Sequence, residues 1–472
     1  MLSKEAFISE VSAKVKHRLN DDQNEAVASV YDFLFQGGGR SLFILRGYAG
    51  TGKTTLMGAL IRWFHSVNRK TVLLAPTGRS AKVLSAHSGY PASTIHRRIY
   101  SFKQDDFGRM SMQLAQNKSE KTMFIVDEAS MIGDGSGEDG IRGRSLLEDL
   151  LEYVYSGERC RLILIGDDAQ LPPVGMDLSP ALNKKRMAVL LKGAVYEATL
   201  TQVVRQEEGS LILENATQLR EQLTEGEFGN LHLKTQRHGD VEVIDSYDLE
   251  DELSRAFGGK ADNDSVIVCR SNKDAYQFNH QIRNRILMRE SELEAGDRLM
   301  IVKNNYFWKI PGRRQNFLAN GDMVTVERLF SVDEFGPFRF ADVQVRFSDE
   351  ESDGFHLIVL LNSIEYDGPS IPPKEIMKLR DEMISSGVLD QAEPQEKFFQ
   401  NPYFNAVQVK YAYAVTCHKS QGGQWENVIV HQGYLTHEML DRSYYRWLYT
   451  ALTRATSRVG LVGFHEQFLV TD

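Results

Sequence analysis

Residues 41–55 read SLFILRGYAGTGKTT, and the rest of the chain is organised around this stretch. An apolar run ends at Gly47, a glycine-rich turn follows, and helix-forming residues continue after Thr55. The pattern is G-x-x-x-x-G-K-T between a buried strand and a helix, which is the setting that a phosphate-binding loop requires. Glycines let backbone N–H groups converge on phosphate oxygens, and the start of a helix adds a positive dipole end. The sequence therefore predicts a nucleotide site here.

Each polar residue of this loop has an expected task. Lys53 would neutralise the β- and γ-phosphates, and the Thr54 hydroxyl would bind Mg²⁺. The predicted phosphate-binding residues are Gly47, Gly50, Gly52, Lys53, Thr54 and Thr55.

The composition is that of an ordinary globular protein with room for about three domains. Its 472 residues carry a net charge of −9, which neither indicates nor excludes a nucleic-acid partner, since cations can gather in one channel. We expect no leader and no membrane span, because charges interrupt residues 1–20 and no apolar run approaches the roughly 18 residues that a span needs. Cys160, Cys269 and Cys417 lie far apart and are interpreted as reduced thiols, which predicts a cytoplasmic location.

Three further apolar strands are predicted after the loop, each followed by polar residues. They are Thr71–Ala75 before PTGRSAKVL, Met123–Val126 before Asp127-Glu128, and Leu162–Ile165 before GDDAQLPPV. Strands that alternate with helical segments indicate a doubly wound parallel sheet, in which ligands bind at the carboxyl ends of strands. Thr77, Asp127 and Gln170 all fall at such ends.

The acidic pair and one glutamine are the next candidates for the nucleotide site. Asp127 could hold Mg²⁺ through water, and Glu128 could orient and deprotonate the attacking water. The alternative is an acidic pair that only closes a strand. Gln23 follows a predicted cap, Asn20, in a helix expected over residues 21–36, and its amide suits the edge of adenine. An exposed surface glutamine is the alternative.

Beyond Leu200 the sequence predicts a second α/β unit interrupted by a small β-barrel. The first unit is expected over residues 1–199, with a polar arm at 100–121. The second unit is expected over 200–320 and 408–472. The barrel is expected over 321–407, where short alternating strands appear. The stretch 298–314 interleaves cations with aromatic residues, which suits a single nucleic-acid strand or, equally, the solvated edge of a strand pair.

Taken together, the motifs resemble those of superfamily 1 helicases, most closely the RecD-like and Dda-like branch. In chain order they are Gln23, GYAGTGKTT, APTGRSAKVL, STIHRRIY, FIVDEASM, LIGDDAQLPPV, LTQVVRQ, YAVTCHKSQGGQ and LYTALTRA. The resemblance implies two RecA-like motor domains with ATP and Mg²⁺ between them, and an SH3-like barrel inserted in the second. It also implies ATP-dependent 5′→3′ movement on single-stranded DNA and unwinding of duplex DNA.

The resemblance assigns roles to further residues. Gln170 would sense the γ-phosphate, and Arg205 and Arg454 would reach it from the second domain, where a planar guanidinium suits developing phosphoryl charge. The arm at 100–121 falls where the family carries a duplex-splitting pin, so Phe102 or Phe107 could stack on the last base pair. A phenylalanine tucked against its own domain is the alternative.

Contacts with the DNA strand are also implied by the resemblance. The expected residues are Thr77, Ser93, Thr94, His96, Thr416, His418, Lys419 and Gln421, with Asn272 and Lys273 as further candidates. Small hydroxyls and helix starts grip phosphates without reading sequence. His96 could equally be a core or capping histidine.

Other functions stay open at this stage. An RNA-directed helicase or a translocase that does not unwind would use the same motifs, and a phosphate-loop switch subunit would share the first half of them. The expected catalytic set is Lys53, Asp127, Glu128, Gln170, Arg205 and Arg454, with Thr54 and Asp127 as metal ligands, and a switch does not need them all. Expected partners are single-stranded DNA, duplex junctions and unidentified replication, recombination or repair proteins, with no membrane.

Overall fold

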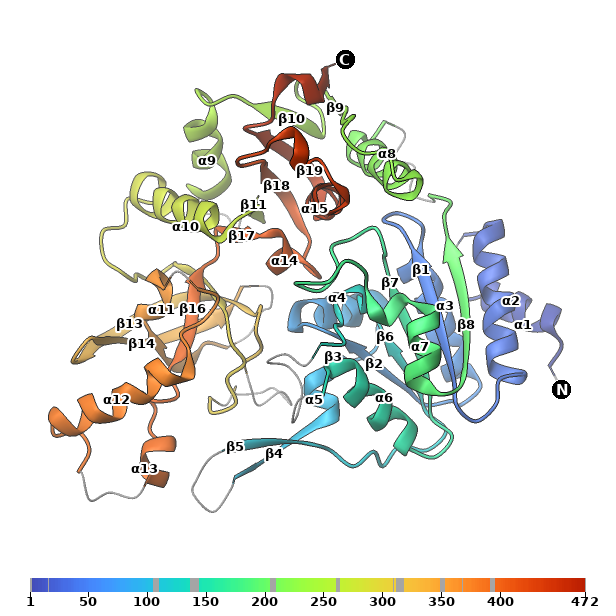
Figure 1. The fold of residues 1–472 in the computed structure, drawn as a ribbon, viewed down its shortest axis with the longest axis horizontal. Coiled ribbons are helices and arrows are strands. Elements are labelled where there is room, and N and C mark those ends of the chain that lie inside the picture. Colours follow the sequence, from blue (N-terminus) through green and yellow to red (C-terminus); the bar gives the residue numbers. More distant parts are fainter. Residues whose placement is uncertain are drawn as a thin grey trace.

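Two parallel sheets and one closed barrel make up the fold (Figure 1). The computed structural model describes residues 2–15, 17–104, 110–135, 144–203, 209–259, 264–308, 310, 318–348, 353–366, 368–390 and 395–471. Within these residues no helix combines the length and the apolar character needed to cross a membrane.

The first sheet has six parallel strands in the order β3-β2-β6-β7-β1-β8. Its strands are β1 (Ser41–Gly47), β2 (Thr71–Ala75), β3 (Ala92–Thr94), β6 (Met123–Val126), β7 (Arg161–Gly166) and β8 (Ala194–Leu200). The accompanying helices are α1 (Lys4–Ser12), α2 (Asp21–Phe35), α3 (Lys53–Ser66), α4 (Gly78–Ser88), α5 (Ile95–Ile99), α6 (Leu146–Ser156) and α7 (Lys184–Leu191).

Both faces of this sheet are covered, which explains why its strands read as unbroken apolar runs. On β1, Phe43 and Leu45 pack with α1, α2 and α3, whereas Leu42 and Ile44 pack with α5, α6 and α7. The doubly wound sheet predicted from the sequence is thereby confirmed, as is Asn20 as the cap of α2.

The second sheet has five parallel strands in the order β10-β19-β18-β11-β17. They are β10 (Val241–Ile244), β11 (Ser265–Cys269), β17 (Ala414–Thr416), β18 (Trp425–His431) and β19 (Ala455–Val462). Helices α8 (Leu211–Glu225) and α15 (Arg442–Leu452) cover one face, and α9 (Leu249–Phe257) and α10 (Asn272–Gln281) cover the other. A short parallel pair, β9 (Leu233–Thr235) and β20 (Leu469–Thr471), lies beside it.

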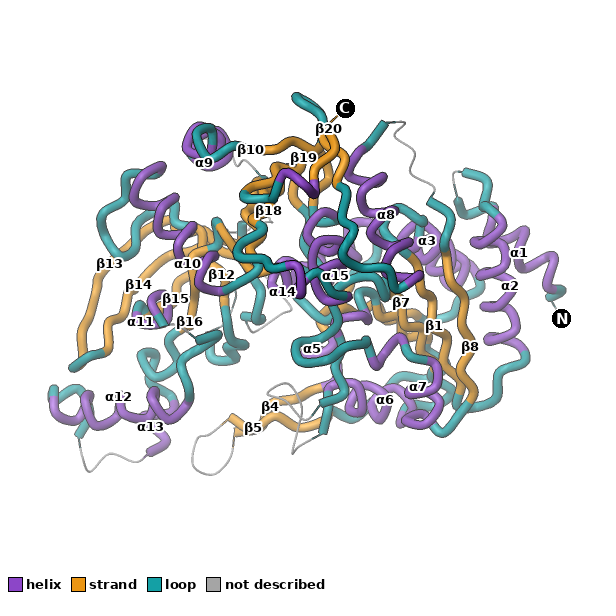
Figure 2. Tube along the Cα trace, turned by 45° about the horizontal axis from the view of Figure 1, so that its top comes forward, coloured by secondary structure: helices purple, strands orange, loops and turns teal. Residues whose placement is uncertain are grey.

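The barrel consists of β12 (Arg298–Ile301), β13 (Met323–Phe335), β14 (Phe338–Phe347), β15 (Phe355–Leu360) and β16 (Val407–Tyr411). Strand β12 lies wholly before the expected span of 321–407, and β16 runs past its end. The reason is closure: β12 pairs antiparallel with both β13 and β16, so the barrel takes one strand from each flanking stretch. Strand β12 reads RLMI, an apolar run like the sheet strands, whereas β16 reads VQVKY and leads directly into the α/β pattern of the second unit, so neither is assigned to the barrel by sequence alone. Helices α11 (Asn362–Glu365), α12 (Pro373–Ser385) and α13 (Gln395–Phe399) accompany the barrel (Figure 2).

A buried carboxylate fastens the barrel to the second sheet. Asp297, which is fully buried, accepts hydrogen bonds from Arg283 at 2.8 and 2.9 Å and from Arg289 at 2.6 Å. The Tyr413 hydroxyl donates to the same carboxylate at 3.0 Å. Since β12 begins at the next residue and Tyr413 directly precedes β17, these bonds fix the joint between the two units.

The polar arm contains an antiparallel hairpin of β4 (Tyr100–Gln104) and β5 (Met110–Leu114), which projects from the first domain (Figures 1 and 2). Tyr100 anchors its base by donating to Asp149 at 2.8 Å. Phe107 and the side chain of Phe102 lie outside the described part of the chain, so the pin role stays a prediction.

Candidate nucleotide site and strand-binding interface

The phosphate-binding loop joins β1 to α3 as predicted. Gly50 and Gly52 have φ of 76° and 81°, a left-handed conformation that glycine adopts without steric strain. The Lys53 ammonium donates to the carbonyl oxygens of Gly47 at 2.5 Å and Tyr48 at 2.8 Å. Thr54 is exposed at the start of α3, where its hydroxyl is accessible to a metal ion. The loop thus presents the donors that a polyphosphate needs.

Gln23 supports this loop from the side. Its side-chain amide donates to the carbonyl oxygen of Thr51 at 3.1 Å, and its oxygen accepts from the Asn20 N–H at 3.3 Å. Both halves of the amide therefore have protein partners in this structure. Adenine recognition by Gln23 stays a prediction that requires these bonds to be exchanged.

Asp127 and Glu128 follow β6 directly, at the carboxyl edge of the first sheet. Burial and the neighbouring Glu128 charge raise the pKa of Asp127 to about 7. The Glu128 N–H donates to the Asp127 carboxylate at 2.9 Å, and Glu128 itself has a left-handed backbone with φ of 52°.

A tyrosine from the second domain is hydrogen-bonded to the phosphate-binding loop. Tyr449 of α15 donates to the carboxylate of Asp167 at 2.7 Å and accepts from the Ala49 N–H at 2.8 Å. Asp167 also lies 3.9 Å from the Lys53 ammonium, and both Tyr449 and Asp167 are almost fully buried. One phenol therefore joins the phosphate-binding loop, the end of β7 and the second domain.

Further contacts cross the same interface. Thr450 accepts from the Leu171 N–H at 2.9 Å, and the Gln421 amide donates to the Leu171 carbonyl at 2.7 Å. The Arg220 guanidinium lies 4.7 Å from the centre of the Tyr48 ring. The GDDAQLPPV and LYTALTRA motifs are thus in direct contact, which neither motif alone could show.

The predicted catalytic residues are only partly gathered at the loop. Lys53 approaches Asp167, whereas Arg454 is buried and donates to second-domain oxygens of Thr450 at 3.1 Å and Gly423 at 3.3 Å. Gln170 is buried close to the interface, and its side-chain oxygen has no hydrogen-bond partner among the described residues. Arg205 lies outside the described residues. The roles of Gln170, Arg205 and Arg454 stay predictions.

The predicted strand contacts form two groups, one on each domain. In the first domain, Thr77 caps α4 and Thr94 caps α5. Ser93 precedes Thr94 on β3. His96 lies on α5, with its ring 5.6 Å from the ring of Tyr100. The second group surrounds α14 (Cys417–Ser420), which Thr416 precedes, with His418 exposed, Lys419 half-buried and Gln421 bound to Leu171 as above.

The two groups approach each other at one point. The Arg79 guanidinium lies 3.7 Å from the centre of the Trp425 ring and donates to the Gln424 carbonyl at 2.7 Å. A Cβ built on Gly422 would lie 3.1 Å from the Thr77 hydroxyl oxygen. Thr94 and Gln421 are buried, so their contribution to strand binding stays a prediction.

Sequence reasoning missed Tyr449, Asp167 and Tyr48. Tyr48 lies in GYAGTGKTT, Asp167 in LIGDDAQLPPV and Tyr449 in LYTALTRA, but these motifs alone predict no role for them. An aspartate beside the strand end in GDDAQ was the available signal for Asp167. Nothing in the sequence pairs Tyr449 with a loop about 400 positions earlier.

The fold and this loop define the class: a phosphate-loop protein with two parallel α/β domains and an inserted barrel. Residues 18–246 match the model of an AAA domain, and residues 411–462 match a UvrD-like helicase C-terminal domain. These matches and those below confirm the resemblance to superfamily 1 helicases of the RecD-like and Dda-like branch.

Curated relatives with helicase names include the following two. The chain is 26% identical to the ATP-dependent RecD2 DNA helicase of Deinococcus radiodurans. The alignment covers 95% of this chain and 49% of the RecD2 helicase. It is 26% identical to the ATP-dependent DNA helicase dda of Enterobacteria phage T4 over 60% of its own length and 62% of the relative. The chain thus spans about half the length of the RecD2 relative. A solved Pif1 helicase from Bacteroides aligns over 97% of this chain and 95% of its own at 15% identity, with a TM-score of 0.48.

Replacing Tyr449 by phenylalanine should weaken the contact between the domains. The change leaves the Ala49 N–H and the buried Asp167 carboxylate without this partner, so we expect the free energy of unfolding to fall by about 1–3 kcal/mol. Denaturant unfolding measures this loss. Dyes on the exposed positions 189 and 247, introduced as cysteines, would report wider domain separation by energy transfer, since the three native cysteines are buried.

Tyr445→Phe is the matched control for this prediction. The Tyr445 hydroxyl accepts from the Gly229 N–H at 3.2 Å inside the second domain, so its loss should not change energy transfer. Equal energy transfer in Tyr449→Phe and wild type would contradict the bridging role of Tyr449.

The raised pKa of Asp127 predicts a pH-dependent stability. Between about pH 4 and pH 7 the folded protein binds more protons at this carboxyl group than the unfolded chain does, so the free energy of unfolding should fall as pH rises. Asp127→Asn removes this slope. The free energy of unfolding of the variant, compared with that of wild type, should therefore be higher at pH 8 than at pH 5. Glu128→Gln should reduce the slope, because the Glu128 charge is the second cause of the shift. Parallel stability profiles for wild type and Asp127→Asn would refute the assignment.

Proposed function

We propose that this protein is an ATP-dependent DNA helicase that moves on single-stranded DNA, 5′→3′, and unwinds duplex DNA. The main support for this proposal is the pair of hydrogen bonds that joins Tyr449 to Ala49 and Asp167. They connect the phosphate-binding loop of the first domain to helix α15 of the second domain. A motor needs such a tie, because nucleotide binding must change how the domains sit against each other. The names of the RecD2 and Dda relatives support the same activity.

ATP and Mg²⁺ are the proposed substrate and cofactor. Lys53 and the N–H groups of the loop would hold the phosphates, while the exposed Thr54 hydroxyl and the Asp127 carboxylate offer the oxygen ligands that Mg²⁺ prefers. The ion would supply charge neutralisation between the phosphates. Glu128 would accept the proton of the attacking water, and Arg454 would turn from its second-domain partners toward the phosphates.

Two motor domains are proposed for this activity. The first spans residues 1–199, and the second spans residues 200–320 and 408–472. The accessory barrel spans residues 321–407, to which the flanking strands β12 and β16 are added. The substrate would lie across Thr77 and the segment around α14. Three free, buried cysteines fit a reducing compartment such as the cytoplasm. Proteins of replication, recombination or repair are the proposed partners.

The first test is ATP turnover with and without single-stranded DNA. We expect DNA to stimulate turnover and RNA of the same sequence to do so less. Lys53→Ala should abolish the stimulated rate, and Arg454→Lys should lower it by about three to five powers of ten, because lysine keeps the charge but loses the planar fork. Thermal unfolding of each variant controls for misfolding. Unchanged turnover in Lys53→Ala would refute the proposal.

Polarity is tested separately with duplexes that carry a single tail. A 5′ tail should support strand displacement and a 3′ tail should not. Displacement from the 3′ tail alone would contradict the proposed direction while leaving the motor function intact. ATP turnover without displacement from either tail would indicate a translocase that does not unwind.

A further inference from the structure

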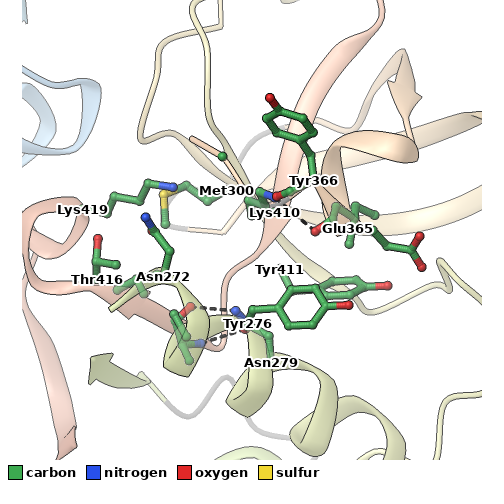
Figure 3. A pocket seen from close by; sticks show the side chains of 15 residues that line it. Asn272, Tyr276, Asn279, Met300, Glu365, Tyr366, Lys410, Tyr411, Thr416 and Lys419 are labelled. Carbon is green, nitrogen blue, oxygen red and sulfur yellow. Dashed lines mark hydrogen bonds between the residues drawn. The ribbon is translucent and has the colours of Figure 1, made fainter. Parts of the chain in front are cut away.

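A pocket lies at the seam between the second sheet and the barrel (Figure 3). It has a volume of about 190 Å³ and is lined from both units. Helix α10 supplies Asn272 and Tyr276, strand β16 supplies Lys410 and Tyr411, and Thr416 and Lys419 come from the TCHKSQG motif. The pocket therefore opens directly beside the segment proposed to hold the DNA strand.

One wall of the pocket is aromatic. Tyr276 lies on the outer face of α10 and is 42% exposed, so part of its ring is open to the pocket. Its ring lies 4.2 Å from the His280 ring, and His280 lies 5.5 Å from the ring of buried Tyr411. Packed rings behind it hold Tyr276 in place, so it presents a fixed aromatic surface on which a flat ligand can stack.

The charges at the rim are distributed unevenly. Figure 3 shows Lys419, Asn272 and Thr416 together on one side of the pocket, with Tyr366 and Glu365 on the other. Lys410 already donates to the carbonyl oxygens of Ile364 and Tyr366. Glu365 is paired with Arg339 at 3.4 Å, whereas Lys419 offers a cation on the side of Asn272 and Thr416, where an anionic group is favoured.

We infer that this pocket receives one unstacked base of a bound single strand, with Tyr276 as its stacking surface. The Asn272 amide would meet the edge of the base, since it offers both a donor and an acceptor. Lys419 would hold the adjoining phosphate. This inference rests on the proposed function, because the strand must already lie beside Thr416.

The site would bind the DNA strand without selecting a particular base. Every base has an aromatic face, so a stacking surface accepts all four. Because the pocket is shared by the second domain and the barrel, an inserted base would move with both of them.

The experiment measures binding of a fluorescent oligothymidylate by anisotropy. Base–aromatic stacking is worth about 1–3 kcal/mol, so Tyr276→Ala should weaken binding by about 5- to 150-fold. Tyr276→Phe keeps the ring and should stay close to the wild-type affinity. Tyr247→Ala, at a 95% exposed tyrosine outside the pocket, is the control and should bind as wild type does.

A second probe separates base contacts from phosphate contacts. On an oligomer of the same length without bases, wild type and Tyr276→Ala should bind equally. Asn272→Ala should weaken binding only of the base-bearing oligomer, which gives a second variant should Tyr276→Ala fold poorly.

Two results would overturn the inference in distinguishable ways. If wild type binds the oligomer and Tyr276→Ala and Asn272→Ala bind it equally well, the base pocket is wrong and the proposed function stands. If wild type neither binds single strands nor hydrolyses ATP faster in their presence, the proposed function falls, and the pocket assignment falls with it.

Discussion

The hydrogen bond between Tyr449 and Asp167 is the constraint on which the arrangement of the two domains depends. An almost fully buried carboxylate needs partners, and here the Lys53 ammonium and the Tyr449 phenol meet that need from opposite domains. Burial and the Asp167 charge also raise the pKa of Tyr449 well above its ordinary value, so the phenol keeps its proton. The remaining lone pair of the phenol oxygen accepts from the loop at Ala49.

This arrangement makes the nucleotide loop sensitive to the second domain. Phosphate oxygens seek the N–H groups and the ammonium that now bind Tyr449, Gly47 and Tyr48. A bound nucleotide would have to exchange some of these bonds, and one of them, from the Ala49 N–H to the Tyr449 hydroxyl, crosses the interface. In the proposed motor, events at the loop would be linked to domain position through the Ala49 N–H, the Tyr449 hydroxyl and the Asp167 carboxylate.

Much of the fold follows from the sequence because local patterns determine it. Strands β2, β6 and β11 are apolar runs between clear breaks, and Asn20 caps α2 as its position predicts. The barrel was foreseen from alternation, but its closing strands β12 and β16 were not, because pairing between distant segments leaves no local mark. The same limit applies to the site: the loop is a local motif, whereas Tyr449 reaches it only through tertiary packing.

The joint at Asp297 has a mechanical consequence. Two arginines and a tyrosine converge on this carboxylate, and only two residues separate β16 of the barrel from β17 of the sheet. Barrel and second sheet are therefore joined as one unit. The barrel also contacts the first domain directly, since the Arg79 guanidinium of α4 lies 3.4 Å from the Met323 sulfur of β13 and the Lys82 ammonium lies 4.7 Å from the centre of the Phe347 ring of β14. A change in the position of the second sheet would thus reach α4 through the barrel as well as the phosphate-binding loop through Tyr449.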